Sequence, residues 1–197
     1  MTKEKDIEFY KTIEGLKKVT RYKPIPQLHE NVACHAYMTI FLAYDIMQTY
    51  DMNLDKGKVI DLLLIHDLPE LGMEFDIPAT EIAESEKVKF DKKQLESAKV
   101  KDLSERFDRG YIKVLFEEFE HKNSNEAKFA NFIDKFESAV NVVTNRCAGF
   151  KTNDDFEFII KRAEAHLNDF PQLKPLVFSV QEQIKKLHSE FRQSSIK

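Results

Sequence analysis

The sequence predicts an all-α protein, built as a helical bundle with additional helices towards its C-terminal end. Five glycines and six prolines are spread over 197 residues, which leaves few positions for the tight turns of a β-rich chain. Hydrophobic residues make up 42% of the chain, and in several segments they recur at the i, i+3, i+4, i+7 spacing of a helix with one buried face. No internal repeat of fixed period is present, so a solenoid is not supported.

The apolar periodicity places the helices along the chain. Stripes at helical spacing lie at residues 32–46, 59–66, 112–119, 129–143, 156–167 and 177–191. The last two stripes predict C-terminal helices over about residues 153–192. The charged, weakly periodic stretch from Thr80 to Arg109 is expected to form an exposed helix or a mobile lid. We expect one domain over residues 1–197.

The charge and composition favour a protein without a nucleic-acid or membrane partner. A net charge of −4 gives no general attraction to polyanions. No apolar run reaches the roughly 20 residues that span a bilayer, and the start "MTKEKDIEFY" is too charged for a secretory signal. Cys34 and Cys147 lack the CxxC spacing of zinc and redox motifs, so we expect reduced packing residues. These features predict a soluble, cytoplasmic protein.

One apolar run, "LLLIHDLPELGMEFDIP" at residues 62–78, contains an ionisable pair. His66 continues the apolar stripe of its helix, and Asp67 lies at the same helical spacing from preceding apolar residues, so both are expected to point inward. Burying a carboxylate without a partner costs on the order of several kcal/mol. The pattern therefore predicts a compensating cation.

His35 in "ENVACHAYM" and Asp134 in "NFIDKFESAVN" extend the possible ligand set, because each lies on an apolar helical stripe. A single histidine on such a face is most often a core residue hydrogen-bonded to the backbone, whereas two histidines and two aspartates on inward faces favour a metal site. Imidazole and carboxylate together suit one divalent ion among Mn, Co, Zn, Ni, Fe and Mg. Glu70 would share the face of the His66-Asp67 pair if the helix continues, although Pro69 can bend this turn.

The order His35, then His66-Asp67, then Asp134 resembles the H…HD…D signature of the HD-domain metal-dependent phosphohydrolases, whose fold is an all-helical core. Further segments are similar in order and spacing to the HD-family 5′-deoxynucleotidases over about residues 15–145: Arg21-Tyr22, "ENVACH", "LLLIHDLPE", "FDIPAT" and "LFEEFEHKNSNEAKFANFIDKFE". The resemblance implies a catalytic core in this region. It also implies metal ligation by His35, His66, Asp67 and Asp134.

The resemblance further implies roles for residues around the metal. The family's catalytic glutamate is matched by Glu70. Its substrate-contacting positions are matched by Arg21, Tyr22, Asp67, Asp76, Ile77, Pro78 and Ala79. Glu70 is expected to position or deprotonate the attacking water and Asp76 to assist the leaving 5′-oxygen or hold the sugar, and these roles can be exchanged. Asp76 suits the cap of a helix or turn before Pro78 about equally well.

The implied reaction is the hydrolysis of deoxynucleoside 5′-monophosphates to deoxynucleosides and phosphate, and members of this family are typically homodimers. Three departures from the family pattern bear on the shape of the pocket: Cys34 in place of an acid, Phe75 in place of glycine and Tyr22 in place of tryptophan. Two alternatives stay open. One is an HD hydrolase of another phosphate ester or nucleotide, and the other is a non-catalytic module that senses a nucleotide through the same site.

Overall fold

The computed structural model describes residues 3–21, 30–73, 85–147, 150 and 152–194. In chain order its elements are α1 (Lys3–Ile13), the 3₁₀ helix η1 (Glu14–Lys18), α2 (Val32–Thr49), α3 (Lys56–Ile65), η2 (Leu68–Glu70), α5 (Glu86–Arg106), α6 (Gly110–His121), α7 (Asn125–Thr144), α8 (Asn153–Arg162), η3 (Pro171–Leu173) and α9 (Lys174–Ser194). These described ranges contain no strand, only an isolated antiparallel bridge between Thr20 and Asn31. The predicted all-α fold is confirmed.

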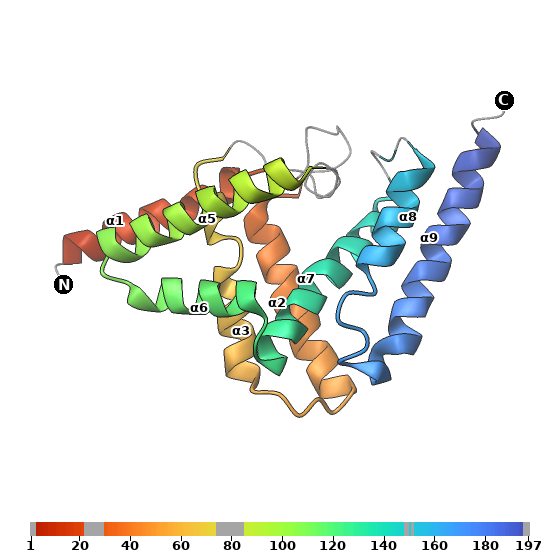
Figure 1. Ribbon diagram of the computed structural model, residues 1–197, viewed down its shortest axis with the longest axis horizontal. Helices are drawn as coiled ribbons and strands as arrows, with labels where there is room; N and C mark the ends of the chain where they lie inside the picture. Colours follow the sequence, from red (N-terminus) through yellow and green to blue (C-terminus); the bar gives the residue numbers. More distant parts are fainter. Residues whose placement is uncertain (1–2, 22–29, 74–84, 148–149, 151, 195–197) are drawn as a thin grey trace.

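Helices α2, α3 and α7 contact one another at the centre of the molecule (Figure 1). On one side of this centre lie α1, α5 and α6, and on the other side lie α8 and α9. Helix α5 packs on α6 and on the short turn η2, whereas α9 packs on α7 and α8. The two histidines and two aspartates singled out in the sequence all belong to the three central helices or to the turn after α3.

Two clusters of buried apolar side chains match this division. The larger one is built around α7, where the rings of Phe132 and Phe136 stack with centroids 5.5 Å apart, and it continues into α8 and α9. The smaller one joins α1, α5 and α6, with Phe9 and Phe107 in edge-to-face contact. Such aromatic pairs stabilise a core beyond their buried area. Because α7 is held firmly in the larger cluster, the position of Asp134 is fixed by the core.

Side-chain caps fix where the central helices begin. Asn31 accepts a hydrogen bond from the backbone N–H of Cys34 (2.9 Å), which places His35 in the first turn of α2. Asp55 and Ser124 cap α3 and α7 in the same way. A cap of this kind typically contributes about 1 kcal/mol to stability. These local interactions therefore set the register that brings the site residues together.

The charged stretch after residue 84 forms a regular helix rather than an unstructured connection. Helix α5 spans Glu86–Arg106 and is mostly exposed, which confirms the exposed-helix interpretation for these residues. Val100 and Leu103 are buried beside α6, so the C-terminal half of α5 is anchored in the smaller core. The other faces of α5 carry charged residues because they contact solvent. This is why apolar residues recur only weakly at helical spacing in this segment.

Two details differ from the sequence predictions. Helix α1 was not predicted; its buried residue is Phe9, and Ile13 packs partly buried against the same cluster. Helix α8 ends at Arg162, so Ala163 and Leu167 reach the core from the turns after it. No helix in the described ranges combines the length and apolar character needed to cross a bilayer.

The two cysteines are free, but they are not both packing residues. Cys147 is buried, and this burial raises the pKa of its thiol to about 11. Cys34 is exposed on α2, so the prediction that it packs in the core is wrong. Neighbouring positions on a helix point about 100° apart, which is why Cys34 faces outward although His35 is fully buried.

Candidate functional site

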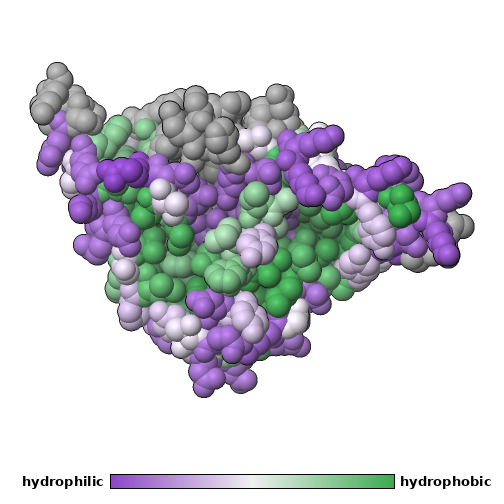
Figure 2. Space-filling model, turned by 180° about the vertical axis from the view of Figure 1, so that it is seen from behind, coloured by the Kyte–Doolittle hydropathy of each residue, from purple (hydrophilic) through white to green (hydrophobic). Residues whose placement is uncertain are grey.

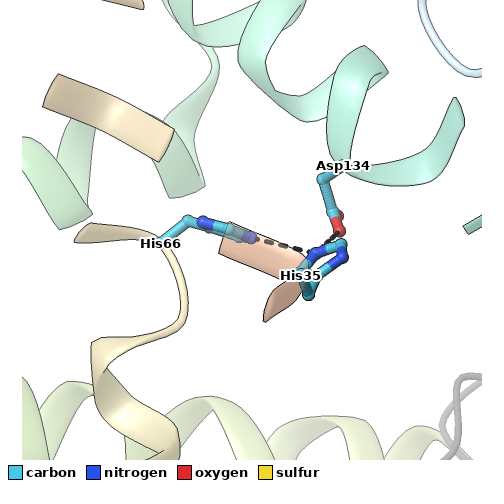
Figure 3. Close-up of side chains that lie close together, drawn as sticks. All are labelled: His35, His66 and Asp134. Atoms are coloured by element: carbon cyan, nitrogen blue, oxygen red, sulfur yellow. Dashed lines mark hydrogen bonds and ion pairs between the residues drawn. The ribbon is translucent and has the colours of Figure 1, made fainter. Parts of the chain in front are cut away.

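Three central elements direct His35, His66, Asp67 and Asp134 towards one point. His35 comes from the first turn of α2, His66 and Asp67 follow the last residue of α3, and Asp134 lies in the middle of α7. Figure 3 shows the side chains of His35, His66 and Asp134 pointing at one another. Both histidines are buried, and the two aspartates are largely buried as well. The structure thus brings together all four residues that the motif order suggested as ligands.

The closest atoms in this cluster are potential metal donors. The Nε2 atoms of the two histidines are 3.4 Å apart, and Asp134 Oδ1 is 3.3 Å from His35 Nε2. Asp67 Oδ2 lies 3.2 Å from His66 Nε2 and 3.7 Å from His35 Nε2. Donor atoms that each lie about 2.1 Å from one shared ion are roughly 3.0 to 3.5 Å from one another. The spacing of these atoms therefore suits a single ion between them.

The other ring nitrogen of each histidine is already engaged. His66 Nδ1 lies 2.7 Å from the carbonyl oxygen of Leu63, and His35 Nδ1 lies 2.6 Å from Glu137 Oε2. Since a carbonyl or a carboxylate accepts a hydrogen bond, both Nδ1 atoms carry the proton in the metal-binding form. Both Nε2 atoms then present a lone pair to the centre of the cluster, and a cation between them removes their mutual repulsion.

A buried oxygen gives a second sign that a cation belongs here. Asp67 Oδ2 is inaccessible to solvent and accepts no hydrogen bond from any residue that the structure describes. Buried polar atoms are normally satisfied, so an unsatisfied carboxylate oxygen facing two imidazole nitrogens needs an explanation. Coordination to a metal ion supplies it. His35, His66 and Asp134 form a group that could hold an ion, and Asp67 adds a second carboxylate beside the two imidazoles, which fits a divalent ion.

The pKa values of the cluster reflect its excess of acid. Burial, followed by the Arg21 guanidinium, acts to lower the pKa of His35. Hydrogen bonds to Asp134 and Glu137 outweigh both and raise this pKa to about 9. Burial opposes ionisation of Asp67, but the neighbouring His66, together with His35 and Arg21, holds its pKa well below the usual range. The acids around His35 thus favour its positively charged form, and the same acids would favour a bound cation.

Arg21 lies directly beside the cluster, as the family resemblance implied. Its Nη1 is 3.5 Å from Asp67 Oδ2, its Nε is 3.7 Å from Glu30 Oε2, and its Nη2 donates a hydrogen bond to Ser138 Oγ (3.3 Å). The backbone N–H of Arg21 also donates to the carbonyl of Glu30 (3.2 Å), next to the Thr20–Asn31 bridge. These contacts hold a buried guanidinium, a good partner for phosphate oxygens, at the edge of the cluster.

Glu70 does not share a helix with the His66-Asp67 pair. Helix α3 ends at Ile65, and Leu68–Glu70 form a separate 3₁₀ turn that begins beside Pro69. A proline cannot donate a backbone hydrogen bond, which explains why the α-helix does not continue. Glu70 is 4% exposed, and its Oε1 lies 3.8 Å from Lys92 Nζ of α5. Glu70 was expected to share a helix face with His66 and Asp67 if α3 continued; instead it lies in a turn that packs against α5.

Helix α5 adds charged residues that sequence reasoning did not place near the site. Lys92 Nζ is 3.4 Å from Glu96 Oε1, and the ammonium of Lys99 donates to the carbonyl of Leu71 (3.0 Å). Burial raises the pKa of Glu96 to about 7, against the opposing effect of Lys92. The only signal in the sequence was the high charge of this segment, which is equally typical of a solvated helix face.

The far side of Asp134 carries a second set of basic residues that the sequence analysis missed. Lys135 Nζ lies 3.1 Å and Arg162 Nη2 lies 4.0 Å from Asp134 Oδ2, whereas Oδ1 faces His35. Burial opposes ionisation of Asp134, but Lys135, His35 and Arg162 hold its pKa well below the usual range. Arg162 belongs to α8, so no pattern near the motif indicated this contact.

Tyr22 and the stretch Asp76, Ile77, Pro78 and Ala79 lie outside the described residues. Their suggested contacts with substrate stay predictions.

Comparisons with known proteins agree with this geometry. The sequence profile of the family described as "HD domain" matches residues 13–174. The curated protein named 5′-deoxynucleotidase HDDC2 from Xenopus laevis is 32% identical over 135 residues, which cover 66% of this chain and 64% of that protein. The protein of the same name from Danio rerio is 30% identical over 138 residues, which cover 68% of this chain and 66% of that protein. The matched region thus spans just under two thirds of these relatives.

Two solved structures share the fold. One, the PH0347 protein from Pyrococcus horikoshii, has a TM-score of 0.68 at 22% identity, with 90% of this chain and 99% of that chain covered. Another, described as a predicted metal-dependent phosphohydrolase from Magnetospirillum magnetotacticum, has a TM-score of 0.71 at 19% identity, with 94% and 95% covered. Together with the ordered His, His-Asp and Asp residues at the centre of the bundle, the profile match shows that the chain belongs to the HD-domain family.

Proposed function

We propose that this protein is a metal-dependent phosphohydrolase that converts deoxynucleoside 5′-monophosphates to deoxynucleosides and inorganic phosphate. The observation that carries the proposal is the cluster of His35, His66 and Asp134 with Asp67 beside both imidazoles and the Arg21 guanidinium 3.5 Å from Asp67. A metal site beside a buried guanidinium suits a phosphate ester. The relatives named 5′-deoxynucleotidase support this class of substrate.

His35, His66, Asp67 and Asp134 are the proposed ligands of one divalent ion. When bound, such an ion lowers the pKa of a water molecule and withdraws charge from phosphorus. The ligand set is compatible with Mn, Co, Ni, Fe, Zn or Mg, because imidazole suits the softer of these ions and carboxylate the harder. Four protein ligands leave coordination positions for water and substrate on an ion that accepts six.

Arg21 is the proposed anchor of the phosphate group. Its planar guanidinium can donate to two phosphate oxygens at once, which lysine cannot match in geometry. Contacts with Glu30, Asp67 and Ser138 hold the side chain in place before substrate arrives, so little conformational entropy is lost on binding.

Glu70 is the proposed acceptor of a proton from the attacking water. Its carboxylate is buried, and the Lys92 ammonium 3.8 Å away stabilises the ionised form that a general base requires. Asp76 is the proposed group at the leaving 5′-oxygen, and Tyr22 with Ile77, Pro78 and Ala79 are proposed to contact the nucleoside. Exchange of the roles of Glu70 and Asp76 would keep the same reaction.

The test is an assay of phosphate release from deoxy- and ribonucleoside monophosphates, with Mn, Co, Zn or Mg added separately to purified protein. We expect release from deoxynucleotides, a smaller rate with ribonucleotides, and none after the substitution His66→Ala. Discrimination against one added hydroxyl is modest in a purely steric pocket, roughly 10- to 200-fold. If the metal binds but no deoxynucleotide is hydrolysed, the nucleotidase proposal fails, and another phosphate ester or a nucleotide sensor takes its place.

We also propose that the protein forms a homodimer through a hydrophobic part of its surface. Figure 2 shows hydrophobic residues gathered in a band across the face seen from behind. On α2, the outward residues Tyr37, Phe41 and Tyr44 are 66%, 53% and 52% exposed and share one side of the helix. A large apolar face on a protein surface usually marks an interface, and a face with few charges can pair with a second copy of itself.

The substitution Phe41→Glu is expected to turn the dimer into a monomer, because it introduces a charge into an apolar contact. Light scattering coupled to size-exclusion chromatography measures the mass in solution. Phe178→Glu on α9, where the native side chain is 50% exposed, is the matched control and should leave the dimer intact. A wild-type protein that is monomeric, or a dimer unaffected by Phe41→Glu, would refute this interface.

The proposed location is the cytoplasm, which the two free cysteines support because oxidising compartments favour disulfides. We further propose that residues 1–197 form one domain with its catalytic core at about residues 15–145. Helices α8 and α9 share the larger hydrophobic core with α7, and this supports their inclusion in the same unit.

A further inference from the structure

Glu137 is a buried acid next to the metal cluster that neither the motif nor the proposed mechanism uses. It lies three residues after Asp134 on α7 and is 3% exposed. Its Oε2 is 2.6 Å from Nδ1 of His35, which is itself fully buried. Residues three apart on a helix share a face, so one turn of α7 presents both a proposed metal ligand and the hydrogen-bond partner of another.

This contact determines what His35 offers to a metal. A carboxylate can only accept a hydrogen bond from imidazole, so the proton is held on Nδ1 and the lone pair is left on Nε2. Nε2 is the atom that faces His66, Asp67 and Asp134. A negatively charged acceptor also makes imidazole a stronger donor to a metal than a neutral acceptor does. His66 has only the carbonyl of Leu63 in the corresponding place.

A second acid, the largely buried Glu30, lies close by but is directed at another partner. One oxygen of Glu30 and one of Glu137 lie within 4.8 Å of a ring nitrogen of His35. Glu30 Oε2, however, is 3.7 Å from Nε of Arg21, whereas Glu137 Oε2 is 2.6 Å from Nδ1 of His35. Glu30 therefore faces the guanidinium, and Glu137 is the hydrogen-bond partner of the imidazole.

We propose that Glu137 is a positioning residue of the metal centre, which fixes the tautomer and the orientation of His35 and thereby strengthens metal binding. The inference extends the proposed function, but it concerns only the binding of the ion. This role explains why the carboxylate of Glu137 is buried although its desolvation costs free energy. Removing a partner of this kind typically weakens metal affinity by about 10- to 100-fold.

The substitution Glu137→Gln tests the proposal with almost no change in size. An amide can donate to Nδ1 as well as accept from it, so His35 is free to move its proton to Nε2 and lose the lone pair. The matched control is Glu117→Gln on α6, because Glu117 is exposed and pairs with Lys113 at the surface (3.7 Å). Dissociation constants for Mn²⁺ and Co²⁺ are measured by competition with a chelator, without any nucleotide.

We expect the dissociation constant to rise about 10- to 100-fold in Glu137→Gln and to stay unchanged in the control. Nitrogen chemical shifts of the His35 ring in the metal-free protein should show a change of tautomer or protonation, which a merely structural role would not produce. A folded Glu137→Gln protein that binds both metals within about twofold of the wild type, with unchanged ring shifts, overturns the proposal.

The substitution Glu137→Asp keeps the charge but shortens the reach by one methylene group. We expect it to weaken metal binding less than glutamine does, so the two variants separate the effect of charge from the effect of position. If circular dichroism shows that Glu137→Gln does not fold, the aspartate variant tests the proposal instead. In that case, unchanged metal affinity of the aspartate variant overturns the proposal. A wild-type protein that binds metal but hydrolyses no deoxynucleotide would refute the proposed substrate and leave the role of Glu137 unaffected.

Discussion

The substitution Asp67→Asn is expected to abolish both metal binding and phosphate release while leaving the helical bundle folded. The amide is nearly identical in shape to the carboxylate, but it is neutral and a weaker donor to a divalent ion. It also removes the charge that faces Arg21 at 3.5 Å, so the guanidinium loses a partner that holds it beside the cluster. We expect turnover to fall by at least about 10³-fold, equivalent to roughly 4 kcal/mol of transition-state stabilisation.

The measurements are the bound metal per chain, the rate of phosphate release and the circular dichroism spectrum. Asp102→Asn is the matched control, since Asp102 is exposed on α5. This control should keep wild-type metal content and rate. Turnover of the Asp67→Asn protein within about tenfold of the wild type would show that Asp67 is not a ligand.

The substitution Phe132→Ala is expected to cause a large loss of stability. Phe132 is fully buried, with its ring centroid 5.5 Å from that of Phe136, 6.1 Å from Phe129 and 6.4 Å from Phe170. Truncating a buried phenylalanine leaves a cavity and typically lowers the free energy of unfolding by about 3 to 5 kcal/mol. For a chain of this size the melting temperature should fall by roughly 10 °C.

Denaturant and thermal unfolding, followed by circular dichroism, measure this loss. Phe178→Ala on α9 provides the comparison, because the same atoms are removed from a side chain that is 50% exposed. It should change stability by less than about 0.5 kcal/mol. Equal losses in the two variants would contradict the assignment of Phe132 to the central core. Weaker metal binding in Phe132→Ala is also expected, since α7 carries Asp134.

Periodicity in the sequence was sufficient for most of the helices. The stripes that predicted α2, α3, α6, α7 and α9 are strongly apolar, and such faces can be buried in few ways. Helix α1 was missed because it buries only Phe9 among many charged residues. The end of α8 was misplaced because Ala163 and Leu167 reach the core from turns, and burial by itself does not distinguish a helix from a turn.

The candidate ligands could be identified from the sequence because they are ionisable residues on otherwise apolar stripes. His35, His66 and Asp134 lie up to about a hundred positions apart, yet their pattern alone suggested that each points inward. The sequence also indicated that Pro69 could interrupt a helix that continued past Asp67. Its outcome, a 3₁₀ turn that places Glu70 beneath α5, depended on packing that the sequence does not reveal.

The sequence by itself determined the helical class, most helix positions and the set of residues that suggests a metal centre, because these depend on local periodicity and side-chain chemistry. Only the tertiary structure decided which partners surround that set. Glu137 bonds to His35 across 102 positions, Ser138 accepts from Arg21 across 117, and Arg162 reaches Asp134 from another helix. Contacts of this kind are set by the crossing of helices in space, and no local pattern in the chain records where two helices meet.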